Sequence, residues 1–192
     1  MISATEERRE TSSTGVSEAE RAEMEALGYV RPTGGPGPRP EHPAERPPIA
    51  RRAVSAPSVL NEAHAYDRPS SFSRALTFDI GDTTMMLISG TASVDDRGET
   101  VHVGDFRAQL WRTFRNITEL LRAEGMTWHD IVRTTCYIRD IERDYDDFNE
   151  VRTAFYDWLG LDPLPASTAI QARICRSDLL VEIEAIAVRP SR

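Results

Sequence analysis

Apolar residues recur with a regular spacing only from about residue 54 onward. In residues 105–125 and 144–160 they lie three or four positions apart, which is the spacing of one face of an α-helix. Shorter apolar runs bounded by turn residues are typical of β-strands, and five such runs cover residues 73–81, 83–90, 131–140, 166–174 and 179–188. The order β-β-α-β-α-β-β predicts an α+β domain over residues 53–192.

Two helices of this kind can cover only one face of the predicted sheet. The strands have apolar residues on both faces, so the second face would be exposed to water in a single chain. Extended apolar surface of this kind is uncommon on monomers and marks a contact with another molecule. The pattern therefore predicts an oligomer, in which another subunit covers the second face.

Residues 1–52 follow a different pattern and are predicted to form a tail outside the domain. Residues 1–16 are polar with few apolar positions, a composition typical of disorder. Residues 31–52 are rich in proline and glycine and offer almost nothing to bury, which indicates a semi-extended linker. Only the segment between these two stretches has the pattern of a helix.

That segment begins and ends like a short amphipathic helix, predicted at about residues 17–28. Ser17 and Glu20 have the spacing of a capping box, and Gly28 is typical of the position after a helix end. A helix of about ten residues is marginal in water without a partner surface. One interpretation is that residues 17–30 dock on a protein shell or scaffold. The others are that the helix packs on its own domain or has no role.

Charge and composition argue against several classes of partner. The 192 residues carry a net charge of −8, which disfavours nucleic acid or an acidic membrane surface as the main partner. No apolar run approaches the roughly 18 residues of a membrane span, and residues 1–13 lack the apolar core of a signal peptide. Two cysteines are too few for a disulfide scaffold. These features favour a cytoplasmic protein, and the docking interpretation adds the interior of a protein compartment as a candidate location.

The basic residues are all arginine, since the chain contains no lysine. A lysine Schiff base and a Walker-type phosphate loop both require lysine, so both are excluded. The four histidines are scattered without the spacing of metal ligands, and neither a metal site nor a cofactor is predicted. Cys136 lies in the middle of a predicted strand, as expected of a buried packing residue.

The last predicted strand contains two glutamates, Glu182 and Glu184, among apolar residues. Because side chains alternate between the two faces of a strand, both carboxylates point to one face and the apolar residues to the other. A buried charge is costly unless it is paired, so each carboxylate is either the partner of an arginine or a functional group. A carboxylate beside a cleft can orient water or shuttle a proton.

Several short segments of the chain occur together, and in the same order, in one known family. They are "ISG" at 88–90, Gln109 with Asn116, "DIVRTTCYIRD" at 130–140, "FNEV" at 148–151, "LPAST" at 164–168 and "VEIEAIAV" at 181–188. Residues 54–190 thus resemble the Rid (YjgF) family, some of whose members are enamine/imine deaminases. The resemblance implies a chorismate-mutase-like fold and a homotrimer with a barrel-like core, whose small-molecule clefts lie between neighbouring subunits.

The resemblance also implies roles for individual residues. In the family, the first glutamate of the final segment lines the cleft and helps to place the attacking water, and that residue is Glu182 here. The backbone near Gly90, Ser167 and Thr168 would hold the substrate. Asn149 matches a cleft-side asparagine, although an asparagine near a helix start can also simply bond the backbone.

Two positions depart from the family pattern. Deaminases of the family carry an arginine directly after the Pro-Ala of "LPAST", where it grips the substrate carboxylate, but this chain has Ser167. Serine cannot make a bidentate charged contact with a carboxylate, so the usual imine substrates are expected to bind poorly. Phe72 replaces the family's tyrosine, either as a pocket wall or as a core residue. Arg74, Arg152 and Arg173 are candidates to supply the missing charge.

The sequence leaves three functions open. The first is a Rid-family enzyme that hydrolyses an enamine, an imine or a related metabolite with altered specificity. The second is a chorismatase-like lyase or hydrolase, because "ISGTASV" and "LPASTAIQ" are also similar to the C-terminal half of chorismatases. The third is a non-catalytic trimer that binds a small molecule, or a compartment cargo protein held by its N-terminal helix.

Overall fold

The computed structural model describes residues 18–27, 29, 31, 35–38, 49–66 and 69–191. Contacts between residues divide the chain into two units, residues 1–48 and residues 49–192. Within the described ranges, no helix is both long enough and apolar enough to cross a membrane.

The first unit contains helix α1, Glu18–Ala26. After the helix the chain turns back on itself, because the backbone N–H of Gly37 donates to the carbonyl of Tyr29 at 2.7 Å. Ser17 and Gly28, the residues expected to bound this helix, lie outside the described residues.

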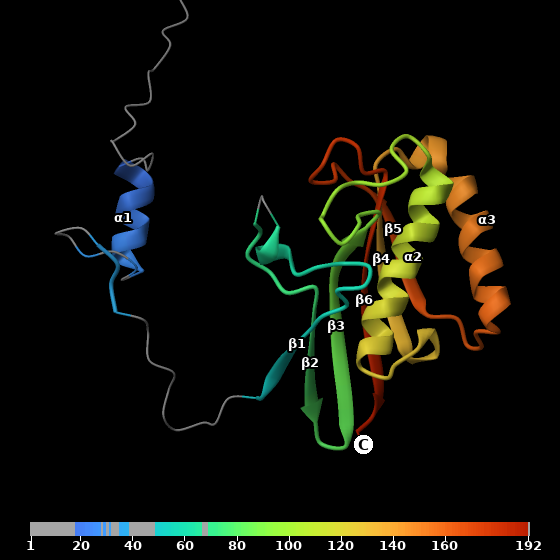
Figure 1. Cartoon of the computed structure of the whole chain (residues 1–192), viewed down its shortest axis with the longest axis horizontal. Coiled ribbons are helices and arrows are strands. Elements are labelled where there is room, and N and C mark those ends of the chain that lie inside the picture. Colours follow the sequence, from blue (N-terminus) through green and yellow to red (C-terminus); the bar gives the residue numbers. More distant parts are fainter. Residues whose placement is uncertain are drawn as a thin grey trace, which may run out of the picture. The chain divides into compact units, whose positions relative to one another are not determined.

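The second unit is built on a six-stranded mixed sheet with the order β1-β2-β3-β6-β4-β5 (Figure 1). Strands β4 and β5 are parallel, and every other neighbouring pair is antiparallel. All five predicted strands are present. The bounds are β1 Arg51–Val54, β2 Ala75–Ile80, β3 Thr83–Ala92, β4 Ile131–Ile138, β5 Ala166–Gln171 and β6 Val181–Pro190.

The structure adds one strand, β1, to the predicted order. It pairs antiparallel with β2, from Arg51 opposite Phe78 to Val54 opposite Ala75. Three of its four side chains are exposed, so the alternation that predicts a half-buried strand is missing from its sequence. This edge strand is held by backbone pairing, and its first two residues lie in the stretch, residues 31–52, that composition alone predicts to be linker.

Two helices, α2 at Phe106–Ala123 and α3 at Ile141–Leu159, lie side by side on one face of the sheet, as predicted (Figure 1). The side chains of Asp105 and Asp140 each accept a hydrogen bond from a backbone N–H in the first turn of the helix that follows. Gly160 ends α3 with a φ of 65°, a left-handed conformation that favours glycine.

An aromatic cluster packs the two helices together. Phe114 of α2 stacks on Phe155 of α3, with ring centroids 4.5 Å apart and planes 11° apart. Trp128 meets Phe155 edge to face, with centroids 5.1 Å apart. Fully burying one large apolar side chain contributes about 1.5–3 kcal/mol to the free energy of folding. This cluster and the buried residues of β6 belong to one core, and the candidate site is built on it.

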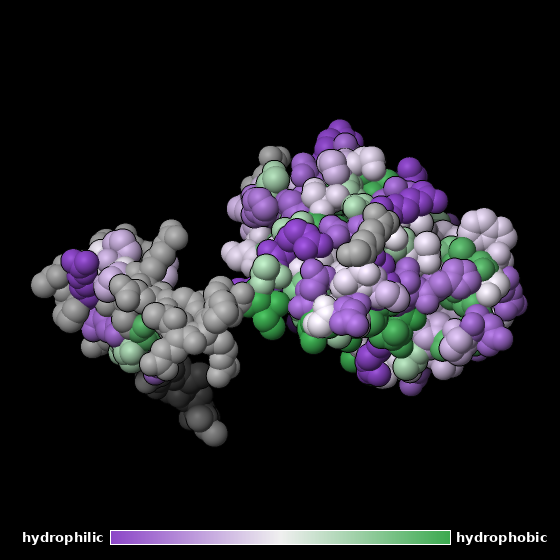
Figure 2. Space-filling view, turned by 90° about the horizontal axis from the view of Figure 1, so that it is seen from below, coloured by the Kyte–Doolittle hydropathy of each residue, from purple (hydrophilic) through white to green (hydrophobic). Residues whose placement is uncertain are grey.

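The face of the sheet opposite the helices carries both apolar and charged side chains. Along β6 the apolar residues alternate into the core, and Glu182 and Glu184 point to the open face, as predicted. Leu87 and Ile170 are 39% and 42% exposed. On the side of the unit that Figure 2 shows, apolar residues likewise form separate patches between polar ones. That a second subunit covers the open face stays a prediction.

Candidate active site

A bulge in strand β3 makes room for the carboxylate of Glu182. The pairing of β3 with β6 shifts between Ile88 and Thr91, so that β3 has one residue more than β6 over this stretch. A Cβ atom on Gly90 would lie 2.1 Å from Oε1 of Glu182, closer than any real contact. The absence of a side chain at Gly90 therefore leaves the space in which this carboxylate lies.

Glu182 and Gly90 line a pocket of about 320 Å³, here named the Glu182 pocket. Its volume is within the range of sites that bind small molecules. Its walls come from β3, β6, the segment before β2 and the loop between β5 and β6, and its other lining residues include Tyr66, Phe72, Arg74, Ser89, Cys175 and Arg176. The pocket thus brings three of the predicted site residues together, namely Phe72, Gly90 and Glu182.

Arg74 is a fixed cation in the wall of the Glu182 pocket. It is only 7% exposed, and its Nε donates to the carbonyl of Asn61 at 3.0 Å. Its guanidinium carbon lies 5.1 Å from the centroid of the Tyr66 ring and 5.3 Å from that of Phe72, within the range of cation–π contacts. Phe72 is 41% exposed, so it forms part of the pocket wall rather than the core.

Burial raises the pKa of the Glu182 carboxyl above its ordinary value of 4.5. The charge of Arg74 lowers this pKa, the charge of Glu184 raises it, and burial has the largest effect. A carboxyl with a raised pKa accepts a proton more readily near neutral pH than an exposed glutamate does. Glu182 is therefore the candidate general acid–base group of this pocket.

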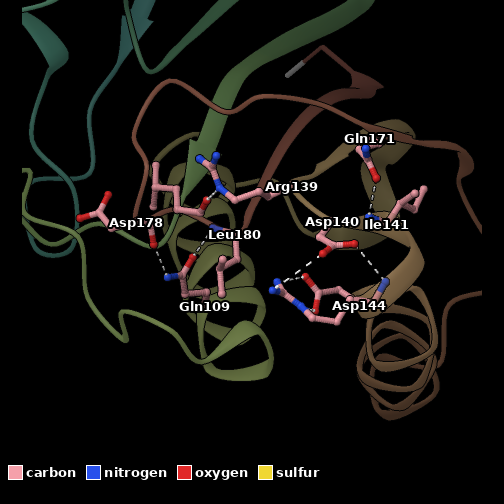
Figure 3. A network of polar contacts seen from close by, with 10 residues as sticks. Gln109, Arg139, Asp140, Ile141, Asp144, Gln171, Asp178 and Leu180 are labelled. Atoms are coloured by element: carbon pink, nitrogen blue, oxygen red, sulfur yellow. Dashed lines mark hydrogen bonds and ion pairs between the residues drawn. The ribbon is translucent and has the colours of Figure 1, made fainter.

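The loop 172–180, which forms one wall of the pocket, is fastened by the buried side chain of Gln109 (Figure 3). The Gln109 amide donates from Nε2 to the carbonyl of Asp178 at 2.8 Å and accepts a bond from the N–H of Leu180 at 2.8 Å. Because both ends of the amide are satisfied, the loop is fixed to helix α2 without an unpaired buried group.

Arg139, at the end of β4, fastens the same loop from the other side (Figure 3). Its Nε donates to the carbonyl of Leu179 at 2.6 Å, and its Nη2 donates to the carbonyls of Ile174, at 3.2 Å, and Arg176. Leu179, Cys175 and Arg176 all line the Glu182 pocket. Arg139 therefore positions one wall of that pocket.

Sequence reasoning assigned no role to Gln109, Asn116 or Arg139. The amide of Asn116 donates to the carbonyls of Ala92 and Val94, both at 3.0 Å, and these two residues also line the pocket. The signal was present in the sequence, because Gln109 and Asn116 lie on the apolar face of a predicted helix. A buried amide there needs backbone partners.

Ser167 and Asn149 lie at a second place, between β5 and α3. Arg152 of α3 donates from Nη1 to Oγ of Ser167 at 3.2 Å and from Nη2 to Oδ1 of Asn149 at 2.7 Å. The guanidinium carbon of Arg152 lies 4.6 Å from the centroid of the Phe148 ring, and Thr134 donates to Ser167 at 2.9 Å. These five residues are named the Arg152 cluster. Asn149 bonds an arginine side chain in it rather than the backbone.

Thr168 lies apart from both places. It is on the face of β5 opposite Ser167, and its hydroxyl accepts a hydrogen bond from Arg133 at 3.2 Å. Arg173 is exposed. Ser167 does not line the Glu182 pocket. A single chain therefore separates the predicted site residues into three groups.

The cysteines and acidic residues add no further site. Cys136 is buried in β4, and burial raises the pKa of its thiol, which keeps the thiol protonated. In the part of the chain that the structure describes, histidine, cysteine and acidic residues form no group that could hold a metal ion.

Proteins of known sequence and structure relate this chain to one family. The family described as endoribonuclease L-PSP matches residues 64–189. The chain is 32% identical over 111 residues to the 2-iminobutanoate/2-iminopropanoate deaminase of Salmonella typhimurium, which is 58% of this chain and 83% of that protein.

Two crystal structures from Escherichia coli share the fold. The YjgF gene product is 26% identical with a TM-score of 0.58, and the match covers 72% of this chain and 98% of that chain. TdcF with bound serine is 25% identical, also with a TM-score of 0.58, and covers 72% and 98%. With its matched sequence segments and its mixed sheet covered by two helices, the chain belongs to the endoribonuclease L-PSP family, the family of the Rid and YjgF proteins.

Proposed function

We propose that this protein is a homotrimeric enzyme that hydrolyses a small imine, or the enamine in equilibrium with it, with a specificity different from that of the usual family substrates. The observation that carries the proposal is the Glu182 carboxyl, whose pKa is raised and which lies against Gly90 in a pocket of metabolite size. Two similar proteins support this substrate class. One is named 2-iminobutanoate/2-iminopropanoate deaminase, and the other binds serine in its crystal structure.

The proposed reaction exchanges a C=N bond for a C=O bond. Water adds its oxygen to the imine carbon while Glu182 accepts a proton from it, and the π electrons of the C=N bond move to nitrogen. Glu182 then returns the proton to nitrogen, which gives a tetrahedral amino alcohol. The hydroxyl proton next passes by way of Glu182 to the same nitrogen as the C–N bond breaks, so that ammonia leaves and the hydroxyl becomes a carbonyl. An enamine first gains a proton on its β-carbon and loses one from its nitrogen, which gives the imine. The balance is imine plus water giving carbonyl compound plus ammonia, with no redox change.

The proposed cleft lies between neighbouring subunits of a homotrimer. In one chain, the Glu182 pocket and the Arg152 cluster are separate. A closed ring of identical copies repeats one head-to-tail contact at each interface, and such a contact would bring the cluster of one copy to the pocket of the next. The open face of the sheet would form the barrel-like core. Sedimentation equilibrium tests this arrangement, and a stable monomer at micromolar concentration would contradict it.

The proposed change in specificity comes from two replacements. Ser167 offers a hydroxyl where the resemblance places an arginine, and Phe72 has no hydroxyl to offer the substrate. A hydrogen bond between charged groups contributes roughly 1.5–3 kcal/mol. We therefore expect 2-iminopropanoate, the small substrate named for the relatives, to be hydrolysed slowly compared with a larger or differently shaped imine.

Ammonia release is the experiment that tests the function. Freshly generated 2-aminoacrylate and a series of larger 2-imino acids are offered to the protein, and at least one is expected to give ammonia faster than buffer does. If none does, and chorismate instead gives pyruvate, the chorismatase-like alternative is correct. If neither reaction is accelerated while small acids bind, the protein is a non-catalytic binding trimer.

A further inference from the structure

We infer that Arg152 binds the substrate carboxylate, taking the place of the arginine that is missing at Ser167. This inference rests on the proposed function, because it concerns the substrate of the same site. The sequence left Arg74, Arg152 and Arg173 as equal candidates for this role, and the inference chooses one of them.

The geometry of the Arg152 cluster places a guanidinium group at Ser167. Nη1 of Arg152 lies 3.2 Å from the Ser167 hydroxyl oxygen, so a charged fork occupies the space that a longer side chain at residue 167 would reach. Asn149 accepts from Nη2 at 2.7 Å, and the Phe148 ring lies below the guanidinium at 4.6 Å. These contacts fix the orientation of the fork and leave other N–H groups to donate to an anion.

The charges around Arg152 point to an incoming anion. Helix α3 contains six acidic residues, yet the positions three and four residues away from Arg152 are Phe148, Asn149, Phe155 and Tyr156. No carboxylate of the described residues lies within ion-pair distance of Arg152, whereas Arg107 lies 2.6 Å from Asp147 and Arg143 lies 2.6 Å from Asp144. In an acidic protein, a half-buried cation held only by neutral groups can bind an anionic ligand with little competition.

The other two candidate arginines fit this role less well. Arg74 uses Nε for the carbonyl of Asn61 and is within cation–π distance of two aromatic rings, and its charge already acts on Glu182. Arg173 is exposed, and a solvated cation binds a carboxylate weakly. Arg152 is the candidate that adjoins Ser167 and has no carboxylate partner among the described residues.

Moving the guanidinium from strand β5 to helix α3 changes where a carboxylate can bind. The fork approaches from the helix side and is braced by Asn149 and Ser167, so the carboxylate would bind at a shifted position relative to Glu182. The class of ligand is thus a carboxylate-bearing 2-imino or 2-oxo acid, with a chain shape different from that of the usual substrates.

Binding of pyruvate and of acetone, measured by titration in an NMR or calorimetric experiment, tests the inference without any turnover. The two probes differ only in the carboxylate. The wild-type protein is expected to bind pyruvate more tightly than acetone, and Arg152→Gln is expected to weaken pyruvate binding roughly ten- to a hundredfold while leaving acetone binding unchanged. Arg173→Gln is the matched control and should change neither.

Exchanging the side chains of residues 152 and 167 distinguishes the loss of a carboxylate-binding charge from structural damage. The double variant Arg152→Ser, Ser167→Arg is expected to regain much of the pyruvate affinity that Arg152→Gln loses. Unchanged pyruvate binding in Arg152→Gln, or a wild type that does not prefer pyruvate to acetone, would overturn the inference. A wild type that binds pyruvate through Arg152 but releases no ammonia from any imine would instead overturn the proposed function alone.

Discussion

The Glu182 pocket and the Arg152 cluster are built in opposite ways. In the pocket, a carboxyl and a guanidinium act on each other, and loop 172–180 is fastened around them by buried hydrogen bonds. In the cluster, a guanidinium has only neutral contacts and lies beside β5, an edge strand whose side chains are mostly exposed. The Glu182 pocket thus holds both a negative and a positive side chain. The Arg152 cluster lies at an exposed edge and holds a positive side chain without a carboxylate partner among the described residues.

The two regions supply different parts of the proposed chemistry. A proton-transfer group needs a fixed, partly dehydrated environment to keep its pKa raised, and one chain can supply that environment. A carboxylate-binding group needs an approach from outside, and β5 leaves it accessible. Because Ser167 does not line the Glu182 pocket, our proposal is that one copy completes the site of another.

Replacing Glu182 should have the largest effect on activity. Glu182→Gln keeps the shape of the side chain but removes proton transfer, so the rate of ammonia release is expected to fall roughly 10²- to 10⁴-fold. Glu184→Gln is the matched control, because it lies on the same face of β6 but does not line the Glu182 pocket. Equal losses in the two variants would contradict the assignment of Glu182 as the proton-transfer group.

A methyl group at residue 90 should disturb the same carboxylate through packing. Gly90→Ala places an atom 2.1 Å from Oε1 of Glu182 and is expected to destabilise the protein by about 1–3 kcal/mol. Glu182→Ala removes the carboxylate that the new methyl group would contact. The losses in free energy of unfolding from the two changes, measured with urea, should therefore not add. Additive costs would show that the bulge of β3 needs glycine for its backbone rather than for Glu182.

The raised pKa of Glu182 should appear in stability as well. The folded pKa is above the ordinary value of 4.5, so the native state binds this proton more tightly than the unfolded chain. The stabilisation is fully present below about pH 4.5 and is lost as the pH rises through the folded pKa. Glu182→Gln is therefore expected to raise the unfolding temperature relative to wild type at neutral pH, and this gain should disappear near pH 4. A gain in unfolding temperature that does not change with pH would contradict a raised pKa of Glu182.

The smallest effect is expected from the N-terminal unit. Deleting residues 1–48 removes no strand of the sheet, since β1 begins at Arg51, and the unfolding temperature should not change. Leu27 and Tyr29 are 78% and 64% exposed, which suits a docking segment better than a core.

The docking of residues 17–30 on a protein shell or scaffold stays a prediction. Residues 1–48 fused to a reporter should be recruited to a larger assembly in the native host. A loss of many degrees on deletion, or a reporter that stays diffuse, would end this interpretation.

Periodicity predicted the elements that bury a face, because burial leaves a repeating pattern in the sequence. It missed β1, since only Val54 is buried there. Alternation also placed both glutamates on one face of β6. It could not show that Gly90 makes space for one of them, because that depends on a register shift between two strands. The contact of Arg152 with Ser167 joins residues of a helix and a strand, and only the packed structure brings them together.

Mixed oligomers test whether the Glu182 pocket of one copy works with the Arg152 cluster of the next. Glu182→Gln and Arg152→Gln subunits, each of low activity alone, are co-expressed in equal amounts and purified together. In random assembly about one quarter of the sites would combine an intact Glu182 with an intact Arg152 from the neighbouring copy. Ammonia release by the mixed oligomers is expected to rise clearly above that of both parent variants. Mixed oligomers that are no more active than the better parent would contradict a site shared between copies.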